Sequence, residues 1–253
     1  MTESWLVLSV FFILGALCAS FTGVVAERLH TGQSWIAGRS RCNSCRAHLD
    51  ARDLIPILSW LMHAGKCRQC RARVPGAYAL AELSLGMSFA AAFHLLGFAA
   101  ALPFFLAALI VLLFIVLYDL RHMIVPAGSS TLLLIFALAV ALLRAPAPQA
   151  LGLTLIVAGV IALFFFLLHA CSGGRAMGLG DAPVALALSL LAGTQAVAGL
   201  LFSFWIGALY GVIVLSTRRG GPRMGIEVPF VPFLALGFLL AIFTGWNPLT
   251  FAA

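Results

Sequence analysis

Two aspartates, Asp119 and Asp181, are the residues whose type and placement in this sequence predict chemistry. The chain has eight acidic residues, and each of these two adjoins a long apolar run. An ionisable side chain at membrane depth is costly, so it is a functional hypothesis by default. Two carboxylates that share one site cannot both ionise cheaply, so one keeps its proton while the other acts as a base. Such a pair can activate water and hydrolyse a peptide bond without a covalent intermediate.

The glycines of the string Met177–Asp181 favour this interpretation. Gly178 and Gly180 have no side chain, so backbone can approach closely there, and we expect an extended substrate segment to lie beside Asp181. For either aspartate alone, an ordinary alternative stays open: Asp119, for instance, could cap a helix or pair with the arginine or histidine that follows it. A GxGD string by itself is weak, whereas a GxGD string with a second aspartate is a much stronger pattern.

A third acid, Glu82, lies inside another apolar run. Two interpretations remain open for it. Glu82 could bind an amine or an arginine of a substrate, or it could be a buried hydrogen-bonding residue that fixes helix packing.

Membrane-spanning helices are the elements predicted to position these acids. The chain is 63% hydrophobic and 9% charged, with a mean hydropathy of +1.11, whereas soluble domains are about half apolar and a quarter charged. Because a span needs roughly 20 apolar residues, the sequence predicts an all-α polytopic membrane protein with about eight transmembrane helices. The apolar runs are 5–26, 77–97, 99–118, 127–143, 150–169, 182–193, 197–216 and 228–245. The run 182–193 is short, so we expect it to be tilted or sunk into the protein.

The basic residues predict how these spans are oriented. Nine of the fifteen lie between Arg28 and Arg73, in the one long polar segment. If that segment is cytoplasmic and the spans alternate, only Arg144 lies outside, in agreement with the positive-inside rule. The remaining cytoplasmic arginines are Arg121, Arg175, Arg218, Arg219 and Arg223. The net charge of +7 is thereby explained without nucleic acid, and both aspartates fall at the cytoplasmic ends of their spans.

The sequence divides into three parts: a first transmembrane helix (1–26), a cytoplasmic four-cysteine insert (27–76) and a transmembrane helical bundle (77–253). The bundle contains the predicted peptidase core, at about 100–215. The insert is too small to bury much of a hydrophobic core, so a structural metal would supply folding free energy there.

Four cysteines of the insert form two CxxC pairs, with 21 residues between the pairs: Cys42, Cys45, Cys67 and Cys70. This spacing is typical of a tetrahedral zinc site, and a reducing cytosol disfavours disulfides. An unmetallated or redox-active set of thiols is the alternative. A closed four-cysteine site has no open coordination position, so the predicted role of the zinc is structural.

With these motifs in view, the chain resembles the bacterial prepilin peptidases (type IV leader peptidases), which are GxGD membrane aspartyl proteases. The resemblance extends almost from end to end. The matching blocks are Ser20-Phe21, Arg41-Cys42 with Cys45, Asp53 with Ile55-Pro56, Cys67-Arg68 with Cys70, Glu82-Leu83, Asp119 with His122-Met123 and Pro126, Met177–Asp181, and Val228-Pro229-Phe230 with Pro232–Gly237.

The resemblance implies Asp119 and Asp181 as the catalytic pair of an endopeptidase of the bacterial inner membrane. It implies prepilins or type II secretion pseudopilins as substrates, with membrane lipids as the surroundings, and cleavage of their leader at the cytoplasmic face. It also implies N-methylation of the new N-terminus with S-adenosylmethionine, for which spacing indicates no binding residue.

Several positions differ from the family pattern: Gly23, Leu54, Ala127 and Ala182-Pro183. None of these differences removes a catalytic carboxylate. Two rivals remain. A proton- or cation-coupled transporter would use the aspartates as a relay, and an archaeal-type preflagellin peptidase would not be expected to carry the cysteine insert.

Overall fold

The structure is a computed structural model, and it describes residues 2–29, 34, 40–175, 177–217 and 228–248. Within these ranges every extended regular element is helical, which confirms the predicted all-α class. The chain forms two compact units, Met1–Phe98 and Ala99–Ala253. The arginines at 218, 219 and 223, which the charge argument placed in the cytoplasm, lie outside the described residues.

The first unit is a helix pair that carries the polar insert. Helix α1 (Thr2–Arg28) packs along α3 (Gly76–Leu96), and the rings of Phe11 and Phe93 stack with centroids 4.5 Å apart. The insert between them contains two short elements, η1 (Ala51–Leu54) and α2 (Leu58–Met62). The four cysteines therefore belong to the same compact unit as the first two long helices.

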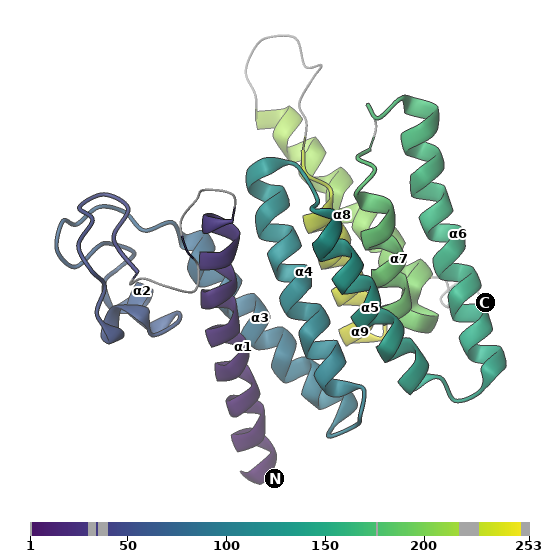
Figure 1. The fold of residues 1–253 in the computed structure, drawn as a ribbon, viewed down its shortest axis with the longest axis horizontal. Coiled ribbons are helices and arrows are strands. Elements are labelled where there is room, and N and C mark those ends of the chain that lie inside the picture. The colour runs from purple at the N-terminus through teal and green to yellow at the C-terminus, as the bar shows by residue number, and fades with distance from the viewer. Residues whose placement is uncertain (1, 30–33, 35–39, 176, 218–227, 249–253) are drawn as a thin grey trace. The chain divides into compact units, whose positions relative to one another are not determined.

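The second unit is a bundle of six helices with α7 (Asp181–Ala192) near its centre (Figure 1). The surrounding helices are α4 (Leu102–His122), α5 (Ala127–Arg144), α6 (Pro148–Ser172), α8 (Ala196–Thr217) and α9 (Val231–Thr244). A single turn, η2 (Gly193–Gln195), joins α7 to α8. Helix α7 contacts α5, α6, α8 and α9, and nine of its twelve residues are buried. Its buried first residue, Asp181, is thus held by a helix that is enclosed on several sides.

Each of the eight predicted apolar runs is a helix in the structure, but the helices differ in length. Among the described residues, six segments are long and apolar enough to cross a membrane, and one of these is the 37-residue stretch Asp181–Thr217 that contains α7 and α8. Alone, α7 spans about 18 Å and α9 about 21 Å at 1.5 Å per residue, short of the ~30 Å hydrocarbon core. As expected for run 182–193, α7 is sunk among its neighbours.

Helices α8 and α9 pack with almost no space between their backbones at Gly237. A Cβ atom added to Gly237 would overlap the backbone nitrogen of Ser203, while one added to Gly211 on α8 would meet nothing within 4 Å. Close approach through small residues is how membrane helices gain packing energy without a hydrophobic driving force. We therefore expect Gly237→Ala to destabilise the bundle by about 1–3 kcal/mol, as overpacking does.

Thermal unfolding in detergent measures this effect, with Gly211→Ala as the matched control on the facing helix. We expect a lower Tm for Gly237→Ala and an unchanged Tm for the control. Equal Tm values for both variants would contradict the close contact.

Candidate active site and metal centre

Asp119 lies in the last turn of α4 and is 5% exposed. The helix ends just after it because Met123 adopts the left-handed conformation, with φ of 53°, and its N–H donates to the Asp119 carbonyl at 2.8 Å. The chain then turns through Val125 into α5, whose first turn follows Pro126. Asp119 is therefore anchored at the end of a rigid helix rather than in a loop.

Asp181 is the first residue of α7 and is 7% exposed. Its N–H donates to the carbonyl of Gly178 at 3.2 Å, and the N–H of Gly178 donates back to Asp181 Oδ2 at 3.1 Å. These two bonds close the GxGD string into a tight turn, because the carboxylate satisfies a backbone donor just before the helix begins. The turn fixes one carboxylate oxygen of Asp181.

The structure brings the two aspartates together, as the sequence predicted. Both belong to the second unit, and their carboxyl groups are close enough to interact electrostatically. Asp119 accepts a hydrogen bond from the backbone N–H of Val231, the first residue of α9, while its Oδ2 is buried without a partner among the described residues. Each carboxyl group thus has a backbone amide that orients it, and Asp119 retains a free buried acceptor.

A close contact explains why position 180 is a glycine, and the sequence did not indicate this contact. A Cβ atom added to it would lie 2.6 Å from the Cβ of Val125, in the turn that follows α4. The segment after one aspartate therefore packs directly on the segment before the other. The predicted role of Gly178 and Gly180, to admit a substrate backbone, stays a prediction beside this contact.

Because the contact joins the two segments that carry the aspartates, we expect Gly180→Ala to lower leader cleavage at least ten-fold by displacing Asp181. A 1 Å misplacement can cost about 100-fold in rate. Rates on a fixed prepilin substrate measure the effect. The double variant Gly180→Ala with Val125→Gly, which removes the opposing Cβ, is expected to recover much of the loss.

Gly128→Ala is the control for this pair, since an added Cβ at Gly128 meets nothing within 4 Å. Full activity in Gly180→Ala, or no recovery in the double variant, would contradict a steric link between the two turns.

His169 and Val231 are positioning residues that sequence reasoning missed. The ring Nδ1 of His169 lies 3.0 Å from the carbonyl oxygen of Met177, which fastens the GxGD turn to the end of α6. The sequence assigns no site role to His169, and Val231 lies between the matching blocks Val228-Pro229-Phe230 and Pro232–Gly237 without belonging to either. His169 lies only eight residues before Met177, so the sequence does contain a signal for this contact. The Val231 contact has no such signal, because it depends on how distant helices pack.

Glu82 lies in the first unit, on α3, and binds the insert. Its Oε2 accepts a hydrogen bond from the backbone N–H of Ile57 at 2.6 Å. Ile57 has φ of 61°, a rare and strained conformation for a β-branched residue, so the carboxylate holds a demanding turn in place. This contact favours the packing interpretation of Glu82. Its predicted binding of a substrate amine stays a prediction.

The four predicted cysteines meet in one cluster. The Sγ atoms of Cys42, Cys45, Cys67 and Cys70 all lie within 4.8 Å of one another, and those of Cys42 and Cys70 are 3.8 Å apart. Two sulfurs bound at 2.3 Å to one tetrahedral zinc would be about 3.8 Å apart. The sulfur positions therefore fit a zinc ion.

Two turns of the same form present these thiols. In the first, the N–H of Arg46 donates to the Cys42 carbonyl and the N–H of Cys42 to the Ala47 carbonyl. In the second, Arg71, Cys67 and Ala72 repeat this pattern, and both arginines have φ of 60°. Hydrogen bonds from the backbone of Cys45 and Ser44 lower the pKa of the Cys42 thiol to about 6. That shift favours the thiolate, the metal-binding form, at Cys42, whereas burial and the three neighbouring thiols raise the pKa of Cys70 to about 11.

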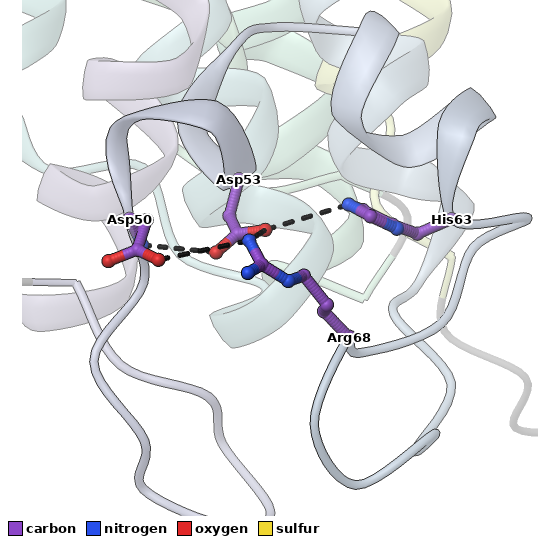
Figure 2. Close-up of polar contacts among 4 residues, drawn as sticks. All are labelled: Asp50, Asp53, His63 and Arg68. Atoms are coloured by element: carbon purple, nitrogen blue, oxygen red, sulfur yellow. Dashed lines mark hydrogen bonds and ion pairs between the residues drawn. The ribbon is translucent and has the colours of Figure 1, made fainter.

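Polar contacts link the second turn to η1 (Figure 2). Arg68 Nη1 lies 3.8 Å from Asp50 Oδ2 and 3.9 Å from Asp53 Oδ1, while His63 Nε2 lies 3.6 Å from the same Asp53 oxygen. The N–H of Asp50 donates to Asp53 Oδ2 at 3.0 Å. The ring of His63 therefore faces a carboxylate. The Arg68–Asp50 pair is exposed, and such a pair contributes about 0–1 kcal/mol, so it orients the turn more than it stabilises it.

Two family models match the chain. The Bacterial Peptidase A24 N-terminal domain matches residues 13–96, and the Type IV leader peptidase family matches residues 106–215. The first match covers the unit with the cysteine cluster, and the second covers the helices that carry both aspartates. No solved structure matches the chain.

Curated relatives extend over nearly the whole length. A protein of Bacillus subtilis (strain 168) is 34% identical, covering 96% of this chain and 97% of its own. One from Myxococcus xanthus (strain DK1622) is 30% identical over 84% of this chain and 64% of its own, and one from Dickeya chrysanthemi is 28% identical over 96% and 95%. All three carry the name "Prepilin leader peptidase/N-methyltransferase".

Proposed function

Because the chain belongs to the type IV leader peptidase family, we propose that it is a multi-pass membrane enzyme with both activities in its relatives' name, leader cleavage and N-methylation of prepilins. Prepilins or type II secretion pseudopilins are then its substrates. The observation that carries the proteolytic half is the pair of buried aspartates, each oriented by a backbone amide. Neither the family matches nor the relatives' names support a transporter.

In the mechanism that this geometry supports, Asp119 and Asp181 share one proton. The ionised carboxylate takes a proton from a water molecule, whose oxygen attacks the carbonyl carbon of the scissile peptide. The protonated partner donates its proton to the carbonyl oxygen. The resulting gem-diol collapses as the carbon–nitrogen bond breaks and the leaving amine gains a proton. General acid–base groups of this kind contribute about 10²–10⁴-fold each to rate. The roles of acid and base belong to the pair as a unit.

The free Oδ2 of Asp119 is the atom that we assign to the shared proton or to the attacking water. Asp181 Oδ2 already accepts the N–H of Gly178, and the N–H of Val231 occupies part of the Asp119 carboxylate. Burial excludes bulk water from both groups, which strengthens every electrostatic interaction in the site.

We assign the four cysteines to one structural zinc ion, which would fold the insert and leave no coordination position for catalysis. The insert, with Glu82 holding its Ile57 turn on α3, is then a rigid platform for recognising the leader. S-adenosylmethionine would supply the methyl group for the second activity, and we assign no residue of this chain to its binding.

We propose a location in the bacterial inner membrane with the insert and both aspartates on the cytoplasmic side. Support comes from the positive-inside distribution of arginines and from the helix directions in the second unit: α4 ends, and α7 begins, at the turns that carry Asp119 and Asp181.

Incubation of the purified protein in detergent with a prepilin peptide, followed by mass spectrometry, tests the proposed function. We expect a single cut that releases the leader, and transfer of one labelled methyl group to the new N-terminus when S-adenosylmethionine is added. An intact peptide would contradict the peptidase. A cut peptide without label would limit the enzyme to proteolysis.

A further inference from the structure

A cavity of about 390 Å³ opens where α5 ends, α6 begins and η2 joins α7 to α8. Its walls include Leu153, Val157 and Val197, with Arg144, Thr154 and Thr194 as polar members. All of these residues belong to the second unit. The cavity is therefore formed by the bundle that also carries the aspartates.

The cavity lies at the end of the bundle opposite the aspartates. Helix α5 begins just after the Asp119 turn and runs to Arg144, about 27 Å for its 18 residues. Helix α7 likewise leads from Asp181 to Ala192, which lines the cavity. Neither of the two aspartates lines the cavity.

The charged lining of this cavity is positive. Arg144 is its sole charged lining residue, and no carboxylate lines it. Within the described ranges Arg144 forms no salt bridge. Thr194 beside it is exposed, and its hydroxyl has no hydrogen bond to another described residue. An arginine presents a planar set of donors that binds phosphate in a bidentate way.

We propose that this cavity binds one phospholipid of net negative charge from the surrounding bilayer. Arg144 and Thr194 hold its phosphate, and an acyl chain lies along the apolar wall of Leu153, Val157 and Val197. A zwitterionic lipid offers the same phosphate, but its ammonium group would find no carboxylate in the lining. The apolar wall likewise gives a free phosphate nothing to bind. The preferred ligand is thus anionic and carries a chain.

Native mass spectrometry of the full chain, released from detergent with added lipid, tests this proposal. We expect phosphatidylglycerol to be retained at least ten-fold more strongly than phosphatidylcholine, and Arg144→Gln to abolish that preference. A ten-fold change equals about 1.4 kcal/mol, within the range of one charge-assisted hydrogen bond. Arg175→Gln, at the other end of α6, is the matched control and should retain the preference.

A second variant tests the contact with the acyl chain of the lipid separately from the contact with its charged phosphate. Val157→Trp fills the apolar wall and keeps Arg144, so it should weaken retention of phosphatidylglycerol. The control Arg175→Gln should retain this lipid as strongly as the wild type does. Equal retention of both lipids by the wild type, or an unchanged preference in Arg144→Gln, would overturn the proposal. Displacement of the lipid by millimolar glycerol phosphate would instead indicate a site for free phosphate, and would overturn it too.

Discussion

Replacement of either Asp119 or Asp181 by asparagine is expected to abolish leader cleavage, with a loss of at least 10³-fold in rate. Asparagine keeps the shape of each side chain but can neither accept the proton of water nor share one with its partner, and each acid–base role contributes about 10²–10⁴-fold. Because both groups are buried and act as one pair, we expect either single change to cost nearly as much as both together. Initial rates on one prepilin peptide give the measurement.

Controls must show that the loss of cleavage comes from the missing carboxylate and not from misfolding. Asp50→Asn makes the same carboxylate-to-amide change at an exposed position of the insert, outside the bundle, and should leave cleavage within about two-fold of wild type, as surface changes usually do. Both aspartate variants should insert into membranes, retain their zinc and unfold near the wild-type temperature. Full cleavage by either variant would refute the shared acid–base mechanism.

The sequence signal that singles out the two aspartates is local. A carboxylate beside 20 apolar residues is an anomaly that needs no tertiary information to be noticed, and charge counting is enough to predict that both lie at one side of the membrane. The two CxxC pairs are likewise a signal that can be recognised in the sequence without tertiary information. The structure accordingly brings Asp119 near Asp181 and gathers Cys42 with the other three cysteines.

Contacts between distant helices could not be predicted in the same way. Membrane helices are apolar on all sides, so hydrophobic periodicity does not indicate which face packs inward. The approach of Gly180 to Val125, the Val231 amide on Asp119 and the Glu82 contact with Ile57 all depend on that packing. The string Met177–Asp181 illustrates this limit: its glycines favoured close approach of a substrate backbone, and the structure adds a tight contact between Gly180 and Val125.

Helix α7 combines a feature that the sequence predicts, its short length, with one that only the packing defines, the helices around it. A run of 12 residues cannot cross the bilayer alone, and burial on several sides fixes the position of its first residue, Asp181, in the bundle. Sequence length predicted the burial, but only the packing identifies α5, α6, α8 and α9 as the helices that provide it. The acid therefore owes its position to its neighbours rather than to its own span.

Loss of zinc is the second large effect that we expect, and Cys42→Ser is the variant that tests it. A serine hydroxyl is a poor zinc ligand, and three thiolates leave the tetrahedron open. Structural zinc sites contribute about 10–16 kcal/mol of apparent binding free energy, which is also folding free energy for a segment that lacks a core. We therefore expect metal content to fall from one zinc per chain to near zero, and the insert to become sensitive to limited proteolysis.

Cys171→Ser provides the control, because this exposed cysteine lies outside the cluster. That variant should keep one zinc per chain and a protected insert. Since the aspartates lie in the other compact unit, Cys42→Ser should lower leader cleavage less than either aspartate variant does, by weakening recognition rather than the acid–base step. A higher KM with a nearly unchanged kcat would express that difference. Unchanged metal content in Cys42→Ser, measured by atomic emission on the purified protein, would refute the zinc assignment and leave the four cysteines as a thiol cluster.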